Sequence, residues 1–144
     1  MKIVKSNRFK PGDAVLIPGD LHFPKHNQKA LDLCLKAAKG FGCNKVMLQG
    51  DNLDSAHISR HGYSRGESFR EDNDCIAAFT AQVKKAGIQP TVAGLGNHDG
   101  SWFEEYAATH PGLSHEDLLP ALYDNWEVLP AGYVLALNKK LVVT

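Results

Sequence analysis

The sequence is poor in the residues and segments that mark several large classes of protein. Its 144 residues include three cysteines, Cys34, Cys43 and Cys75, and these form no CxxC pair. This argues against a disulfide framework and a cysteine-based zinc site, and the odd number predicts free thiols. No segment approaches the roughly 20 apolar residues of a membrane span. Residues 1–11 are basic but lack the apolar stretch of a signal peptide. We therefore expect a cytoplasmic protein without a membrane partner.

The chain also lacks a net charge. Lysine plus arginine and aspartate plus glutamate both number 16, and the isoelectric point is about 7.0. This balance gives no support to a polyanionic partner such as a nucleic acid, although a local basic patch is compatible with it. The hydrophobic fraction of 43% is that of an ordinary globular protein. The length suits a single domain, 1–144, with a real core.

Apolar runs and amphipathic segments alternate along the first two thirds of the sequence. Residues 13–19 are predicted to form an apolar strand of the kind buried on both faces of a parallel sheet, and residues 44–49 and 90–95 are predicted to form the second and third strands. Between them, residues 27–40, with Asn27 as a cap, and residues 68–86 have the apolar spacing of helices and end near glycine. The order β-α-β-α-β predicts an α/β fold with right-handed crossovers.

The pattern changes after Gly100. Residues 102–108 and 114–123 predict short helices, and Ser114 with Asp117 approximates a capping box. Three further segments predict short strands, the last two of them joined by a hairpin turn: 126–129, 133–137 and 141–143. The polar segment 50–67 is long for a loop between a strand and a helix, and such loops are usually functional or disordered.

Each of the three buried strands is followed by glycine and polar side chains. The motifs are Gly19-Asp20-Leu21-His22, Gly50-Asp51-Asn52-Leu53-Asp54 and Gly96-Asn97-His98-Asp99. Ligands of parallel α/β sheets bind at the carboxyl ends of the strands, so these side chains are expected to converge. A single Gly-Asp is a common turn, but three such strand ends in one chain predict a common site.

The residue types at these strand ends are those of a metal site. In a continuing strand, Asp20 and His22 point the same way and can share one cation. Asp51 has two oxygens with which to bridge two cations, and Asn97 offers a carbonyl oxygen. Oxygen and nitrogen ligands without thiolate favour Mn, Fe, Zn or Ni. Two such cations about 3.5–4 Å apart can clamp a phosphate and activate water.

His98 follows Asn97 and is expected to point elsewhere. This position suits a general acid that protonates a leaving oxygen. Asp99 or Asp54 can orient its ring and raise its pKa through charge proximity. The structural alternatives are that Asp20 forms a turn, that Asp54 caps one, and that residues 97–100 are simply a turn.

Asp-x-His, Gly-Asp-x-x-Asp and Gly-Asn-His-Asp, in this order, resemble the calcineurin-like metallophosphoesterases over most of the chain. The stretch that begins with residues 19–24 and ends with residues 58–60 is most similar to bacterial and phage-borne members. The resemblance implies a β-sandwich flanked by helices, with the residues after 125 beginning the second sheet. It also implies a dinuclear site, in which Asp20, His22 and Asp51 bind the first ion, and Asp51 and Asn97 the second. Manganese is the ion expected to support activity in vitro.

The resemblance further implies hydrolysis of phosphate esters, with a metal-bound hydroxide attacking phosphorus and His98 as the catalytic acid. The family completes its site with a further His and a Gly-His-x-His motif after Gly-Asn-His-Asp, and neither is in this sequence. We therefore expect a partial domain that lacks the C-terminal part of the second sheet. His110 and His115 are the candidate substitutes.

Substrate contacts are expected beside the motifs. In the phosphatase branch an Arg-Gly pair follows the equivalent of Asp54, where this sequence has Ser55-Ala56. Arg60 and Arg65 can supply a phosphate-binding guanidinium instead. Lys25 and His26 would flank the entrance, although ordinary surface roles are the favoured interpretation. His57 and His61 are candidates to line the cleft, but we expect them to be solvated loop residues.

Three functional hypotheses follow. The first is a dinuclear metal-dependent phosphoesterase that acts on a phosphate ester. The second is a metal-dependent nuclease or other phosphodiesterase, because phosphodiesters suit the same site. The third is a catalytically incomplete fragment that binds metal without turnover. Neither the substrate nor the oligomeric state can be read from the sequence, since specificity lies in loops.

Overall fold

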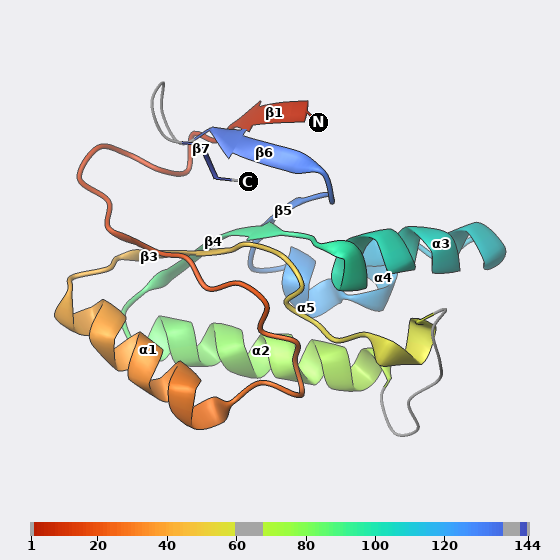
Figure 1. Cartoon of the computed structure of the whole chain (residues 1–144), viewed down its shortest axis with the longest axis horizontal. Helices are drawn as coiled ribbons and strands as arrows, with labels where there is room; N and C mark the ends of the chain where they lie inside the picture. The colour runs from red at the N-terminus through yellow and green to blue at the C-terminus, as the bar shows by residue number, and fades with distance from the viewer. Residues whose placement is uncertain (1, 60–67, 137–141, 144) are drawn as a thin grey trace.

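The computed structural model describes residues 2–59, 68–136 and 142–143, and its fold is mixed α/β. A four-stranded sheet has the order β2-β3-β4-β5, and a second, three-stranded sheet has the order β1-β6-β7. The two sheets lie in separate layers, and the long helices α1 and α2 cover the far face of the larger sheet (Figure 1). This arrangement leaves the larger sheet between a helical layer and the smaller sheet.

The larger sheet is entirely parallel, as the sequence predicts. Its strands are β2 (Val15–Leu16), β3 (Lys45–Leu48), β4 (Gln89–Gly94) and β5 (Glu127–Leu129). β2 is much shorter than the predicted run 13–19. At one end the Asn44 side chain, rather than a strand neighbour, accepts the backbone N–H of Ala14. At the other end Pro18 has no N–H to donate to a ladder.

The expectation that the residues after 125 begin the second sheet is wrong for β5. This strand pairs in parallel with β4, and the N–H of Leu95 donates to the carbonyl of Leu129 beyond the paired residues. The second sheet consists of β6 (Tyr133–Ala136) and β7 (Val142–Val143), which are antiparallel, and β1 (Lys2–Lys5). β1 was not expected as a strand, since it acquires its partner only in the folded chain. The predicted hairpin turn between β6 and β7 lies outside the described residues.

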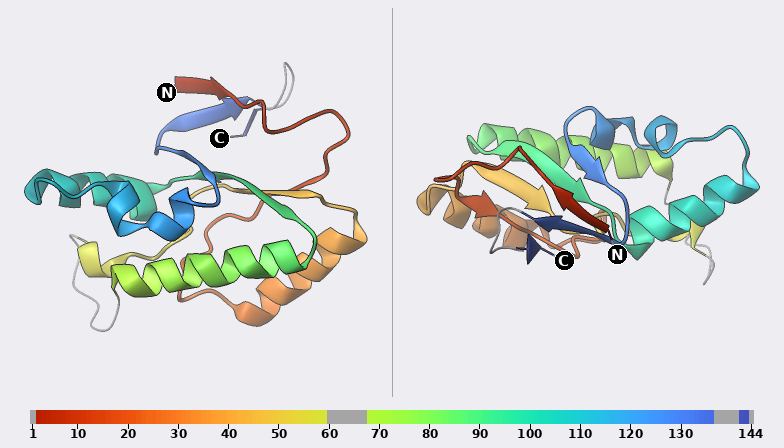
Figure 2. Two further views of the ribbon diagram at one scale, coloured as in Figure 1. Left: turned by 180° about the vertical axis from the view of Figure 1, so that it is seen from behind. Right: turned by 90° about the horizontal axis from the view of Figure 1, so that it is seen from above.

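Both long helices begin at capping side chains. α1 (Gln28–Gly40) follows Asn27, whose side chain accepts the N–H of Ala30, as predicted. α2 (Phe69–Lys85) follows Ser68, which accepts the N–H of Glu71. Their apolar faces pack on β3 and β4 in one core, to which the two helices contribute Leu31, Leu35, Ala38, Ile76, Phe79 and Val83. Figure 2 shows these two helices side by side under the sheet.

A smaller core separates the two sheets. It contains Met47 of β3, Val92 of β4, Leu129 of β5 and Leu135 of β6. The face of the larger sheet opposite α1 and α2 is therefore buried as well, which explains why the central residues of β3 and β4 are apolar on both faces rather than alternating.

The connection between β4 and β5 holds the remaining helices. After a π-helical turn, η2 (Asn97–Ser101), come α3 (Trp102–Thr109), α4 (His115–Leu118) and α5 (Pro120–Tyr123). The predicted helix 114–123 is split, because Pro120 disfavours the helical conformation at Leu119, whose φ and ψ are −127° and 53°. The capping box of Ser114 and Asp117 is confirmed.

The three cysteines are free, as predicted. Among the helices that the structure describes, none is long and apolar enough to cross a membrane.

The segment before β2 is attached to the sheet by a nearly buried ion pair. The ammonium of Lys45 lies 2.8 Å from Asp13 Oδ2, and it also donates to the carbonyl of Arg8. Asp13 in turn accepts hydrogen bonds from the backbone of Lys10 and the side chain of Asn44. The bond from Lys45, followed by those from Lys10 and Asn44, lowers the pKa of Asp13 to about 2.

This pair predicts an acid-labile contribution to stability. The pKa of Asp13 falls from 3.8 to about 2 on folding, so its stabilisation is complete above pH 3.8 and disappears as the pH falls toward 2. Asp13→Asn should lower the free energy of unfolding at pH 7 and flatten its dependence on pH between 4 and 2. Urea denaturation at a series of pH values measures both effects. Asp124→Asn, at an exposed position after α5, is the control. An unchanged pH profile in Asp13→Asn would contradict the assignment.

Candidate functional site

The loops that follow β2 and β3 run side by side beyond the ends of their strands. The N–H of Gln49 donates to the carbonyl of Pro18 over 3.1 Å, and the N–H of Asp20 to that of Gly50 over 3.2 Å. One step further, the N–H of His22 donates to the carbonyl of Asp51 over 3.0 Å. The first two sequence motifs therefore lie next to each other, at the carboxyl end of the sheet, as predicted.

The expected reason for the convergence of Asp20 and His22 is wrong. The strand does not continue through them, because both have left-handed backbones, with φ of 51° and 47°. Asp51, with φ of 48°, and Ser55, with φ of 47°, also have left-handed backbones, in the loop after β3. In the described chain these four are the non-glycine residues with positive φ. Such conformations are unfavourable and concentrate at functional sites.

Two glycines let the second and third motifs approach each other. Gly50 has a φ of 128°, and a Cβ atom there would lie 3.1 Å from the backbone nitrogen of Gly96. A Cβ atom on Gly96 would overlap with the Asp51 carboxylate and lie 2.6 Å from the Asp51 backbone nitrogen. The absence of both side chains therefore permits Asp51 to lie against the start of the third motif.

The third motif is a π-helical turn. The N–H of Ser101 donates to the carbonyl of Gly96 over 3.3 Å, which closes the wide turn of η2. Within it, the N–H of His98 donates to Oδ1 of Asp51 over 2.9 Å. This bond orients the Asp51 carboxylate and joins the turn to the loop after β3. Single π-turns of this kind occur frequently at functional sites.

Asp20, His22 and Asp51 form a group that could hold a metal ion. Each offers one ligand atom, and the three atoms lie within 4.8 Å of one another. Two carboxylates repel each other unless a cation lies between them, and oxygen with imidazole nitrogen suits Mn, Fe, Zn or Ni. These are the residues predicted to bind the first cation, and their donor set and left-handed backbones fit that role.

A second group, His22, Asp54 and His98, also meets the distance criterion. Its carboxylate already has a cationic partner, because the ammonium of Lys25 lies against Asp54 Oδ2. A metal ion beside that ammonium would be repelled, so the first group is the better cation site. Asn97, the expected ligand of a second cation, is exposed at the start of η2 beside Gly96. Its role stays a prediction.

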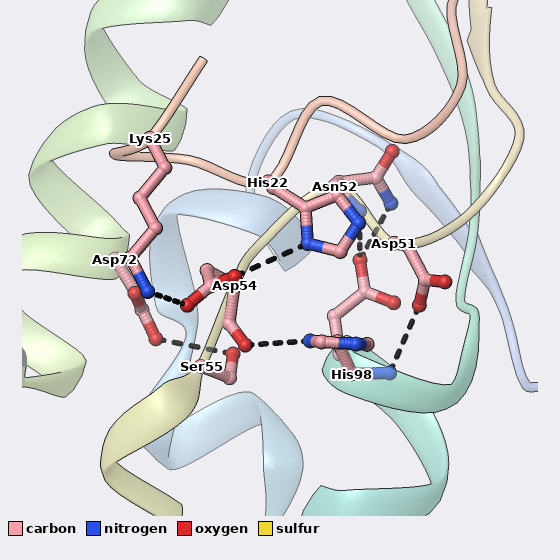
Figure 3. A network of polar contacts seen from close by, with 9 residues as sticks. His22, Lys25, Asp51, Asn52, Asp54, Ser55, Asp72 and His98 are labelled. Atoms are coloured by element: carbon pink, nitrogen blue, oxygen red, sulfur yellow. Dashed lines mark hydrogen bonds and ion pairs between the residues drawn. The ribbon is translucent and has the colours of Figure 1, made fainter. Parts of the chain in front are cut away.

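The carboxylate of Asp54 lies against His22 rather than His98. Its Oδ1 lies 3.3 Å from His22 Nδ1, and Figure 3 shows the carboxylate between the imidazole and Lys25. Burial raises the pKa of Asp54, but the hydrogen bond and charge of Lys25, with the nearby His22, outweigh it and lower the pKa overall. An ionised Asp54 favours the proton of His22 on Nδ1, and Nε2 would then be the nitrogen available to a metal ion. The sequence did not reveal the Lys25 contact.

His98 is held by its surroundings in one orientation. Its Nδ1 lies 2.8 Å from the backbone carbonyl of Asp54, so this carbonyl, and not the expected carboxylate, orients the ring. The His22 ring lies at right angles to it with centroids 4.6 Å apart, and the Trp102 ring packs on it at 3.9 Å. A protonated Nδ1 leaves Nε2 as the nitrogen able to exchange a proton with a ligand.

The Asp99 carboxylate faces away from the His98 ring, contrary to the expectation that it orients that ring. It is fully buried, and its oxygens accept the N–H of Gly96 and both the backbone and side-chain N–H groups of Asn52, each over 2.7 Å. Burial raises the pKa of Asp99, which these hydrogen bonds only partly offset. Asp99 therefore positions the turn by joining it to the loop after β3. Its partner Asn52, also fully buried, was missed in the sequence.

Of the expected substrate residues, His26 lies in the described part of the chain, whereas Arg60 and Arg65 lie outside it. The His26 ring packs edge-on against Phe23 at 4.4 Å, and its Nε2 lies 2.8 Å from Gln28 Oε1. It lines a hollow next to Asp20 and His22.

Of the remaining histidines of interest, those in the described part of the chain are absent from both metal-competent groups. His57 packs edge-on against Phe69 and lies 3.9 Å from Asp72, while His61 is outside the described residues. His110 stacks on Tyr106 at the end of α3. Both ring nitrogens of His115 are engaged, with the Tyr123 hydroxyl at 2.6 Å and the Asp99 carbonyl at 2.9 Å. Neither His110 nor His115 is placed to substitute for a missing ligand.

The chain matches no protein-family model, no curated protein and no solved structure.

The contact between Gly96 and Asp51 predicts the effect of a single methyl group. Gly96→Ala should displace the Asp51 carboxylate, weaken Mn²⁺ binding and destabilise the protein by about 1–3 kcal/mol. Gly40→Ala is the matched control, because a Cβ atom at that helical position meets nothing within 4 Å. It should leave Mn²⁺ binding unchanged and be neutral or slightly stabilising. Calorimetric titration with Mn²⁺ and thermal unfolding measure the two effects, and wild-type Mn²⁺ affinity in Gly96→Ala would exclude this role.

The two possible roles of Asp54 predict different results when His22 is removed. If Asp54 orients His22, Asp54→Asn should weaken Mn²⁺ binding about 10–100-fold and have little further effect in a His22→Ala background. If Asp54 is itself a ligand, Asp54→Asn should weaken binding in both backgrounds. Calorimetric titration of these variants, with Asp124→Asn as control, decides between the roles. An undiminished effect of Asp54→Asn in the His22→Ala background would rule out the orienting role.

Proposed function

We propose that the protein is a divalent-metal-dependent phosphoesterase. The observation that carries the proposal is the convergence of Asp20, His22 and Asp51 on left-handed backbones at the carboxyl end of the sheet. Structural turns do not require three such conformations at one place, and each is unfavourable for a residue other than glycine. A ligand-binding role accounts for all three.

The side chains divide the work of such a reaction. Asp20, His22 and Asp51 would hold the cation, with the orientation of His22 fixed by Asp54 and that of Asp51 by the N–H of His98. A bound divalent ion there would neutralise phosphate charge and make water more acidic, and Mn, Fe, Zn and Ni suit the ligands. A second ion would require Asn97 as an additional ligand.

His98 is the group proposed to transfer a proton to the leaving oxygen. The Asp54 carbonyl fixes the proton on Nδ1, and the rings of His22 and Trp102 restrict rotation. In its protonated form, the ring can then donate from Nε2 without reorienting. The buried Asp99 and Asn52 act on the same step indirectly, because they hold the turn that carries His98.

We expect the protein to hydrolyse p-nitrophenyl phosphate in the presence of Mn²⁺. Asp51→Asn should abolish both Mn²⁺ binding and turnover, while retaining an oxygen that can accept the His98 N–H. His98→Asn should reduce kcat by about 10²–10⁴-fold and leave Mn²⁺ binding intact. Steady-state kinetics and calorimetric titration measure these effects, with Asp124→Asn as the control.

Three substrates separate the alternatives. Hydrolysis of p-nitrophenyl phosphate in preference to bis(p-nitrophenyl) phosphate and single-stranded DNA would identify a monoesterase, and the reverse preference a phosphodiesterase or nuclease. Metal binding without turnover of any of them, with Mn²⁺, Fe²⁺, Zn²⁺ or Ni²⁺, would contradict the proposed activity and favour a catalytically incomplete metal-binding protein.

A further inference from the structure

A hollow of about 460 Å³ lies between the loop after β2 and helix α1, directly beside the candidate metal group. Asp20 and His22 line one end of it. The side chains along the rest include the apolar or weakly polar Leu21, Leu31 and Cys34. Its volume is in the range of sites that enclose a small organic molecule.

A second, smaller hollow of about 220 Å³ adjoins the first. It is lined by backbone and polar groups, namely Gly19, Asp20, Gln49, Gly50, Asp51 and Gly96. Asp20 lines both hollows and is the residue that they share. The smaller hollow contains two carboxylates of the candidate metal group and suits a cation with a phosphate. The larger hollow extends from it toward α1.

The charges that line the larger hollow restrict what it can bind. Of the described residues that line this hollow, Lys25 alone is a lysine or arginine. Its ammonium is paired with the Asp54 carboxylate. A polyphosphate or a nucleic-acid backbone requires several basic side chains along its path. The hollow instead offers the aliphatic surfaces of Leu21 and Leu31 and the aromatic ring of His26.

We infer that this hollow binds the uncharged, apolar organic group of the phosphate ester, while the phosphate lies over Asp20, His22 and Asp51. The inference rests on the proposed function, and it specifies a substrate class: monoesters of compact aromatic or aliphatic alcohols. His26, which packs on the buried Phe23 at the rim of the hollow, is a specificity residue for this group.

Ala30 provides a way to fill the hollow without disturbing the core. It is exposed on α1 and lines the hollow, whereas Ala37 is an exposed alanine of the same helix that does not line it. Ala30→Trp should raise KM for 1-naphthyl phosphate roughly tenfold to hundredfold and leave KM for methyl phosphate unchanged. Ala37→Trp should match the wild-type protein for both substrates. Equal KM values for 1-naphthyl phosphate in the two variants would overturn the inference.

Cys34 gives a readout that does not require turnover. Its thiol lines the hollow, so 1-naphthylmethylphosphonate with Mn²⁺ should slow its alkylation by iodoacetamide at least several-fold, as measured by peptide mass spectrometry. Inorganic phosphate should not, because it occupies only the smaller hollow. Cys43 and Cys75 are internal references, and Ala30→Trp should abolish the protection.

The two readouts separate the failure of the inference from that of the proposed function. Protection of Cys34 by the phosphonate, lost in Ala30→Trp, with no hydrolysis under any metal, would support the binding site and refute the phosphoesterase. Hydrolysis of 1-naphthyl phosphate with neither protection of Cys34 nor an effect of Ala30→Trp would leave the phosphoesterase intact and refute the hollow as its substrate site.

Discussion

The close approach of the Gly50 and Gly96 backbones is the constraint on which the rest of the site depends. A side chain at either position would meet the opposite loop, and at Gly96 it would meet the Asp51 carboxylate itself. With the two loops in contact, the N–H of His98 reaches Asp51, and Asp99 reaches Asn52. The first loop is then attached to the second by backbone hydrogen bonds at Asp20 and His22. Three strand ends are thus joined into one hydrogen-bonded unit.

Charge pairing distinguishes the acidic side chains of this unit from one another. Asp54 has Lys25 beside it, and Asp99 is buried among N–H donors, so both carboxylates are satisfied by the protein. Asp20 and Asp51 have no lysine or arginine partner among the described residues, although their ligand atoms lie close together. Two neighbouring carboxylates in this state attract a cation, which is why the proposed chemistry is assigned to them.

Much of the fold could be predicted from the sequence, because strands, helices and caps depend on neighbours along the chain. The strand β3, the helix that follows Asn27 and the Ser114 capping box are of this kind. The sheet to which β5 belongs could not be predicted, since only tertiary packing decides whether it pairs with β4. The site residues were identified by type and position, but their contacts were not. Asp54 touches His98 through its carbonyl and His22 through its carboxylate, and sequence spacing does not distinguish the two.

The left-handed backbones at Asp20, His22 and Asp51 also limit how this site can change over evolutionary time. Aspartate, asparagine and histidine are, after glycine, the residues that adopt this conformation most readily, and β-branched residues almost never do. The same short set contains the common oxygen and nitrogen ligands of metal ions. Backbone shape and coordination chemistry therefore select the same amino acids, so these side chains would tend to persist here whether or not a metal ion is bound. Their persistence alone would be a poor record of how the site is used.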